Sequence, residues 1–148
     1  MEFNKLIADF ATRHQVENLI VVDAAAALDI DGIIVTMVAK GDVLTISAEI
    51  GEPPVEGAAA FADLLLEANM QSGVFFAKAP GTGTYIAVRR LSLSLIDDEA
   101  FDAALEAFVN QAETWQRLLA DFRPVAKAAA ERVASEAPSF ASPGFMQV

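Results

Sequence analysis

The clearest pattern in the sequence is an apolar stripe close to its C-terminal end. Its members recur at alternating steps of four and three residues: Phe101, Leu105, Phe108, Ala112, Trp115, Leu119 and Phe122. This spacing places all of them on one face of an α-helix, so a long amphipathic helix is predicted. Asp97, Asp98 and Glu99 stand at its start, where the helix dipole favours negative charge, and Pro124 should end or kink it. We expect the stripe to be core.

Patterns upstream predict a first helix and then strands. Residues 2–14 carry apolar side chains at helical steps of three and four, which predicts an amphipathic helix. Residues 43–50 alternate apolar and polar side chains, as a half-buried strand does. Residues 33–39 are apolar on both faces and predict a central strand, joined to its neighbour by a hairpin turn at Gly41. Residues 19–28 combine an Ile-Val-Val run with an Ala run, and we predict a strand within them.

A second helix is predicted over residues 55–71, after Pro53 and Pro54 end the sheet. Its apolar residues are too many for one face: Phe61, Leu64, Leu65, Leu66, Ala68 and Met70. A helix that is apolar on two sides must bury both, one on its own sheet and the other on something else. Two further strands are predicted at residues 74–79 and 84–95, around a turn between them.

The predicted order of elements is therefore α-β-β-β-α-β-β-α. Strands joined by hairpins, with helices between them, predict an α+β fold in which helices pack on a twisted antiparallel sheet. The length of 148 residues suits one domain. We expect that domain to cover residues 1–135, with room for a further helix before residue 135, and we expect a flexible tail over residues 136–148.

Composition excludes several classes of function. The chain has 21 acidic and 10 basic residues and a net charge of −11, so it lacks the clustered Lys and Arg that nucleic acids need. The same sign of charge disfavours anionic membranes. The absence of Cys and the single His remove thiol nucleophiles, thiolate metal sites and His pairs. With no signal peptide or membrane-spanning stretch either, we expect a cytoplasmic, non-enzymatic protein with no cofactor, no metal and no catalytic residues.

Three short motifs suggest chemistry but are better explained as ordinary structure. Residues 29–32 (DIDG) resemble part of a calcium loop, yet Ala27 and Val38 would fall at its first and twelfth positions, where neither can coordinate a cation. Residues 81–84 (GTGT) lack the Lys of a phosphate loop and precede a strand, so a hairpin turn is predicted. His14 lies at the end of the first helix, where a positive charge is favourable.

The apolar content points to binding. Hydrophobic residues make up 54% of this strongly charged chain, and the second helix has more apolar faces than one small sheet can cover. Excess apolar surface on a charged, soluble protein marks an interface. The sequence therefore indicates binding rather than turnover.

Four features, in this order, resemble the bacterial type III secretion chaperones of the Tir-chaperone type. They are the opening amphipathic helix; LTISAEIG at residues 44–51, followed by two prolines; LLLEAN at residues 64–69, which is similar to the Leu-Leu-x-x-Asn helix of that family; and residues 91–95 running into Asp97, with Phe108 and an Ala-Glu-x-Trp motif on the last helix. The likeness spans about residues 2–122, and the order and spacing of the features are more specific together than any one alone.

The resemblance implies a homodimer that holds an extended N-terminal segment of a secreted effector before export. Its interface would be built on the second helix, where we place Phe61, Leu64, Leu65 and Ala68. Apolar side chains of the effector would enter grooves along the first helix and the neighbouring sheet, lined by Phe3, Leu6, Ile7, Phe10, Ile33 and Val35. A short strand of the effector can also add to the sheet edge. The resemblance implies no cofactor.

Two other functions stay open. A non-enzymatic adaptor of the same fold would use the dimer to bind another protein partner, and the neighbouring genes or a pull-down would distinguish it. An enzyme with an acidic pocket for a small ligand is opposed by the absence of Cys, of a second His and of a phosphate loop. A thermal-shift screen with metals and small molecules tests that second alternative.

Overall fold

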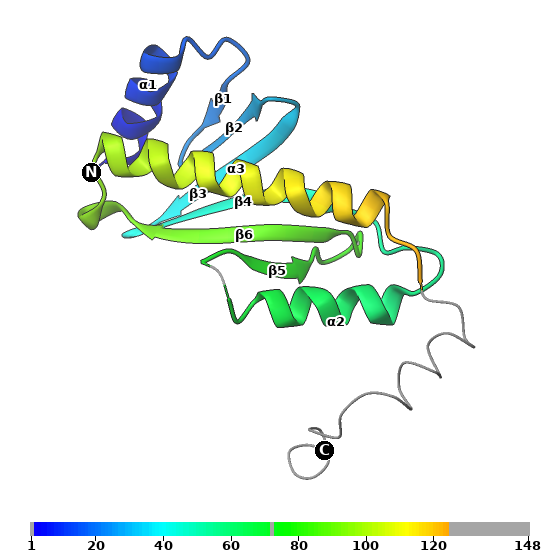
Figure 1. The fold of residues 1–148 in the computed structure, drawn as a ribbon. Coiled ribbons are helices and arrows are strands. Elements are labelled where there is room, and N and C mark those ends of the chain that lie inside the picture. The colour runs from blue at the N-terminus through cyan, green and yellow to red at the C-terminus, as the bar shows by residue number, and fades with distance from the viewer. Residues whose placement is uncertain (1, 72, 125–148) are drawn as a thin grey trace.

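The computed structural model describes residues 2–71 and 73–124. Along them run three α-helices and six strands, with a 3₁₀ turn at Leu93–Leu95 (Figure 1). In chain order the helices and strands are α1 (Phe3–His14), β1 (Ile20–Val22), β2 (Ala25–Ile30), β3 (Ile33–Lys40), β4 (Val43–Gly51), α2 (Ala58–Ala68), β5 (Phe75–Lys78), β6 (Tyr85–Ser92) and α3 (Asp98–Ala120). The further helix and the tail that the sequence suggested lie outside the described residues.

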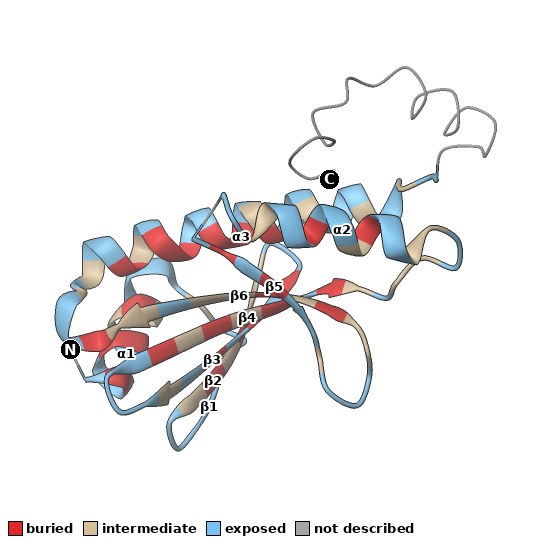
Figure 2. Cartoon of the chain, turned by 90° about the horizontal axis from the view of Figure 1, so that it is seen from below, coloured by how far each residue is buried: buried red, intermediate tan, exposed pale blue. Residues whose placement is uncertain are grey.

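The six strands form one antiparallel sheet in the order β1-β2-β3-β4-β6-β5. The helices cover one face of this sheet, and no other element in the described part of the chain covers the second face (Figures 1 and 2). Along β3, Ile33, Val35 and Met37 are buried, whereas Ile34 and Val38 between them are exposed. A sheet with one covered face requires this alternation. The predicted fold class, an antiparallel sheet with helices packed on it, is confirmed.

The apolar stripe of α3 is confirmed as core. Its members are buried or half-buried against a single cluster: Phe101, Leu105, Phe108, Ala112, Trp115, Leu119 and Phe122. The helix begins where the acidic residues predicted it. Asp97 is the N-cap, and its Oδ1 accepts a hydrogen bond from the Ala100 N–H at 2.8 Å. The 23 residues of α3 thus cross the sheet and fix the core on which the other two helices rest.

Three segments refine the sequence expectation. Residues 19–28 contain two strands, β1 and β2, joined by a tight turn in which Asp23 has a φ of 53°. The Ala run belongs to β2 because pairing with β3 outweighs its helix propensity. Helix α2 begins only at Ala58, because the backbone of Gly57 has a φ of 82°, which is not helical. A glycine is also required at this position because a Cβ would lie 2.8 Å from the Phe122 ring. Residues 93–95 leave the sheet as the 3₁₀ turn.

Candidate partner-binding surfaces

The residues expected to contact an effector lie in the core. All six are at most 7% exposed: Phe3, Leu6, Ile7, Phe10, Ile33 and Val35. They fill the space between α1 and the sheet, and the Phe10 ring meets the edge of Phe101 with 5.5 Å between centroids. The groove expected along α1 is therefore occupied by the side chains of α1 itself. Contact of these six residues with a partner stays a prediction, and it would require α1 to move.

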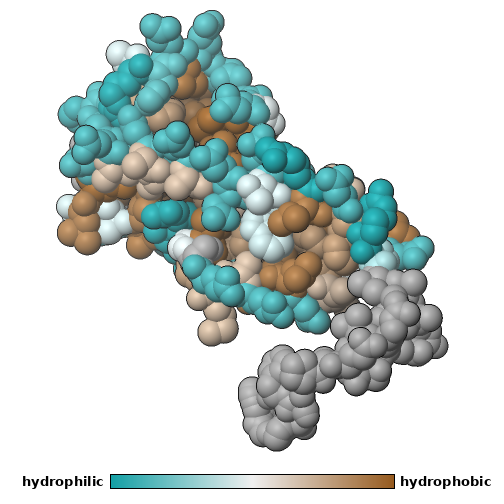
Figure 3. All heavy atoms as spheres, viewed as in Figure 1, coloured by the Kyte–Doolittle hydropathy of each residue, from teal (hydrophilic) through white to brown (hydrophobic). Residues whose placement is uncertain are grey.

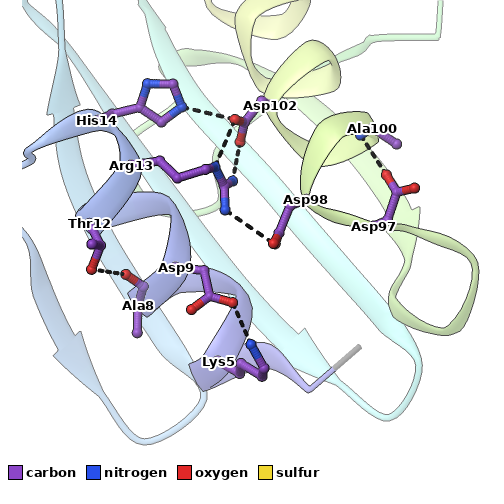
Figure 4. A network of polar contacts seen from close by, with 10 residues as sticks. All are labelled: Lys5, Ala8, Asp9, Thr12, Arg13, His14, Asp97, Asp98, Ala100 and Asp102. Carbon is purple, nitrogen blue, oxygen red and sulfur yellow. Dashed lines mark hydrogen bonds and ion pairs between the residues drawn. The ribbon is translucent and has the colours of Figure 1, made fainter.

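An ion-pair network holds the C-terminal end of α1 on α3 (Figure 4). Arg13 donates to Asp102 through Nε at 3.1 Å and Nη2 at 2.5 Å, and its Nη1 lies 3.2 Å from Asp98 Oδ2. His14 Nε2 lies 2.9 Å from Asp102 Oδ2. Burial by itself would raise the pKa of Asp102, but the hydrogen bonds from Arg13 and His14 outweigh it, so that pKa lies below its ordinary value. His14 therefore fixes a helix end.

The uncovered face of the sheet is apolar over much of its width. Ile34 and Val38 of β3, Val43 of β4 and Phe75 of β5 are all exposed there. The sequence identified β3 as apolar on both sides and central, and it is central in the sheet, but only one of those sides is covered. In the sequence, this second apolar face is marked by Ile34 and Val38, which alternate with the buried residues of β3 and are themselves apolar.

Strand β1 forms one edge of the sheet and is exposed along its whole length. Ile20, Val21 and Val22 are 66%, 44% and 63% exposed. The strand pairs with β2 on one side, and among the described residues no strand pairs with the other side. An open edge with three β-branched side chains and no charge is a template for a further strand.

Helix α2 has one buried and one exposed apolar side, as its sequence indicated. Phe61 is buried against the rings of Tyr85, Trp115 and Phe122, with centroids 5.1 to 6.0 Å away. Leu65 is also buried, whereas Leu64 is exposed. The four residues expected at a dimer interface are thus divided between the two sides, with Ala68 half-buried.

A groove of about 350 Å³ runs between α2 and the edge strand β5. Its lining is mostly apolar and consists of Ala58, Ala59, Ala62, Leu65, Leu66, Phe76, Ala77, Lys78 and Tyr85. In the space-filling view, apolar side chains gather over α2 between hydrophilic ones (Figure 3). The exposed side of α2 and this groove form a second candidate surface, separate from β1 at the opposite edge of the sheet.

The polar motifs of the sequence form turns. Asp29 Oδ1 accepts a hydrogen bond from the Gly32 N–H at 2.7 Å, which closes the β2–β3 turn. Thr82 and Thr84 bond to each other through their hydroxyls at 2.9 Å, in the β5–β6 turn. Among the described residues no group of three or more His, Asp or Glu side chains could hold a metal ion. No helix within the same residues is long and apolar enough to cross a membrane.

A family model agrees with this architecture over most of the chain. The model of the Tir chaperone protein (CesT) family matches residues 5–116, from α1 to the second half of α3. The chain belongs to the CesT family. The resemblance seen in the sequence is thereby confirmed. No curated protein matches this CesT-family chain.

Solved structures share the fold. The ExsC–ExsE complex matches with a TM-score of 0.67 and 24% identity, over 78% of this chain and 92% of that chain. The heterodimeric ExoU–SpcU complex from the type III secretion system of Pseudomonas aeruginosa matches with 0.62 and 16%, over 76% and 97%. YbjN from E. coli, whose suggested role is transcription regulation, matches with 0.60 and 14%, over 79% and 91%. At these identities the likeness concerns the fold.

Proposed function

We propose that this CesT-family chain is a type III secretion chaperone that binds the extended N-terminal segment of an effector and keeps it soluble and export-competent. Membership of the family is the observation that carries the proposal. The ExsC–ExsE and ExoU–SpcU structures, in which a chain of this fold forms a complex, support it. Two surfaces of the chain suit such a partner.

The open edge of β1 suits a segment in extended conformation. A partner strand laid along this edge would bond to backbone groups of β1, which gives affinity without a specific sequence. Ile20 and Val22 are more than half exposed and flank that edge, so apolar side chains of the added strand would pack beside them. A longer segment would continue over the uncovered face, where Ile34 and Val38 would be buried. Burying one such side chain fully contributes about 1.5–3 kcal/mol.

The exposed side of α2 suits a second copy of the chain. Leu66 is 63% exposed on a helix whose opposite side is already in the core, and the groove beside it is apolar. Two copies that meet through α2 would cover Leu64 and Leu66 on both helices, as symmetric dimers do. We therefore assign the homodimer interface to this side of α2, extended by Ala68.

In the proposed complex the partner segment is held by non-covalent contacts alone. A segment held extended cannot fold or aggregate, and its apolar side chains are shielded while it is bound. The net charge of −11 keeps the loaded complex soluble. Release requires only the loss of many modest contacts, so an export motor could strip the segment strand by strand.

The test is a pull-down from the native organism with the full chain as bait. Mass spectrometry identifies the captured protein, and light scattering measures the mass of the complex. We expect a secreted protein, held through its N-terminal segment, with two bait chains for each captured chain. Truncating that N-terminal segment of the captured protein should abolish capture. A complex that survives the truncation would contradict this mode of binding.

A second function, a non-enzymatic adaptor for another protein partner, is favoured by one observation. YbjN shares the fold, with a TM-score of 0.60, and its suggested role lies outside secretion. Capture of a housekeeping protein through a folded domain would support the adaptor. The same pull-down therefore separates the two functions.

A further inference from the structure

The second edge of the sheet, at β5, is occupied by a side chain. Asn69 Oδ1 accepts a hydrogen bond from the Phe76 backbone N–H at 2.7 Å. Its Nδ2 donates to the Phe76 carbonyl oxygen at 3.2 Å. One amide side chain thus satisfies both backbone polar groups of a residue in the middle of an edge strand. This is the pair of bonds that a residue of an added antiparallel strand would make.

The hydrogen-bond pattern between β5 and β6 explains why the backbone N–H and C=O of Phe76 point to the edge of the sheet, where Asn69 can bond to them. The Ala79 N–H donates to the Thr84 carbonyl at 2.8 Å, so residue 79 faces β6. Backbone groups of successive strand residues point to alternate sides. Phe76 and Lys78 therefore direct their N–H and C=O groups away from β6, toward the edge. Of these two residues, Asn69 blocks the more central one.

Two neighbouring features complete the closure of this edge. Lys78 is exposed, and a charged side chain on an edge strand disfavours pairing. Pro80, in the turn two residues beyond the end of β5, has no N–H with which a longer strand could continue the pairing. A strand approaching β5 would find the outward groups of Phe76 occupied and a charged side chain at Lys78, with a proline just beyond the strand.

Asn69 is firmly placed for this role. It follows the last residue of α2, and its own N–H donates to the Leu65 carbonyl at 3.1 Å. Both bonds to Phe76 are partly buried, so displacing the amide would leave polar groups without partners in a poorly hydrated position. The amide is also the Asn of the LLLEAN stretch that the sequence singled out.

We propose that Asn69 closes the β5 edge and so confines strand addition to the β1 edge. Asn69 is then a specificity-determining residue that acts by occupying backbone groups, and it sets where an extended segment can bind. That an extended partner segment binds at the β1 edge rests on the proposed function. The closure itself is a property of the free protein, and it can be tested without any effector.

The first experiment measures backbone amide hydrogen exchange of the full chain by NMR. Asn69→Leu keeps the side-chain size but removes both hydrogen bonds, and the Phe76 amide should exchange roughly tenfold faster, as expected for one lost hydrogen bond. Asn69→Ala also removes both hydrogen bonds and should speed exchange at Phe76 in the same way, which provides a second variant if the leucine variant does not fold. Asn110→Leu makes the same change at an exposed position of α3 and should leave Phe76 unaffected. Equal Phe76 exchange in the wild type and Asn69→Leu would overturn the closure.

The second experiment adds a short capped peptide of alternating threonine and valine and maps the amide shifts. In the wild type the shifts should fall on Val21 and its neighbours in β1. In Asn69→Ala, whose side chain no longer fills the space beside the Phe76 backbone groups, they should appear on Phe76 as well. Shifts on β5 in the wild type would contradict the proposal. Intact closure together with a failed pull-down would refute the effector hypothesis alone, because the exchange measurement involves no partner.

Discussion

The two edge strands of this sheet, β1 and β5, both present backbone N–H and C=O groups on their outer side, but among the described residues only at β5 are such groups blocked. At β1, three β-branched residues lie exposed with no charge among them, and within residues 2–71 and 73–124 no strand pairs with their outer side. At β5, the Asn69 amide occupies the outward groups of Phe76, Lys78 adds a charge, and Pro80 follows just beyond the end of the strand. An open edge is a liability for aggregation unless it has a use. Under the proposed function, a partner strand adds at the open β1 edge, and the protected β5 edge leaves the exposed side of α2 for the proposed contact with a second copy.

The largest expected effect separates fold-supporting residues from partner-binding ones. Phe10→Ala should lower the free energy of unfolding by about 3–5 kcal/mol, because it removes a buried ring from between α1 and α3. Urea denaturation followed by circular dichroism measures this. The matched substitution Val22→Ala at the open edge should cost less than 1 kcal/mol, since the side chain is mostly exposed. A small loss for Phe10→Ala would mean that α1 is not held by its apolar face and can leave the sheet readily.

The next effect tests the open edge directly. The double variant Ile20→Lys and Val22→Lys should weaken capture of the partner about 10- to 100-fold, because two exposed apolar contacts are replaced by charges on an edge strand. Titration calorimetry with the captured partner measures the dissociation constant. Phe75→Lys introduces a charge on the same face but on β5, and it should change that constant less than twofold. Equal losses at the two strands would remove the distinction between the edges.

The third prediction tests whether the exposed side of α2, next to the protected β5 edge, forms a contact between two copies of the chain. Leu66→Asp should weaken the proposed homodimer at least tenfold, because it would place a charge in the apolar contact that we assign to this side of α2. Leu66 is preferable to Leu65, which is buried in the single chain and whose loss would also damage the fold. Leu118→Asp makes the same change at an exposed position of α3 and serves as the control. Sedimentation velocity at micromolar concentration measures the association, and an unaffected dimer would move the interface away from α2.

Most of the elements between the two edges could be predicted from the sequence, but the edge strand β1 could not be separated from β2. Periodicity located all three helices, because each buries one stripe that recurs at helical steps, and it located β3 and β4 by alternation. It could not divide residues 19–28 into two strands, since the turn depends on Asp23 adopting a positive φ. The family resemblance predicted partner contacts at apolar side chains of α1 and β3. Those side chains pack in the core of the single chain, and their contact with a partner stays a prediction, because hydrophobicity alone does not distinguish burial from binding.

The outward-facing residues were harder to find for a physical reason. Ile33 and Ile34 have the same side chain, and only the position of the helices decides that Ile33 is buried and Ile34 is exposed. Likewise, Asn69 belongs to a motif that resembled a family pattern, but its two bonds to Phe76 depend on where α2 ends relative to β5. Long-range placement, which local sequence patterns do not encode, decides both features.

The smallest expected effect concerns the network that fixes α1 beside the open edge. The pKa of Asp102 is lowered in the folded chain, so its carboxylate stabilises the fold above the ordinary Asp value, and that contribution is lost as the pH falls through the lowered pKa. Asp102→Asn should therefore cost up to about 1 kcal/mol at pH 7, typical of a partly exposed ion pair. The difference from the wild type should shrink below about pH 4, where the wild-type carboxyl also becomes protonated. Urea denaturation of both proteins across this range measures the effect. A difference that stays constant with pH would mean that Asp102 acts by its shape and not by its charge, and that α1 is held over the sheet by its apolar face alone.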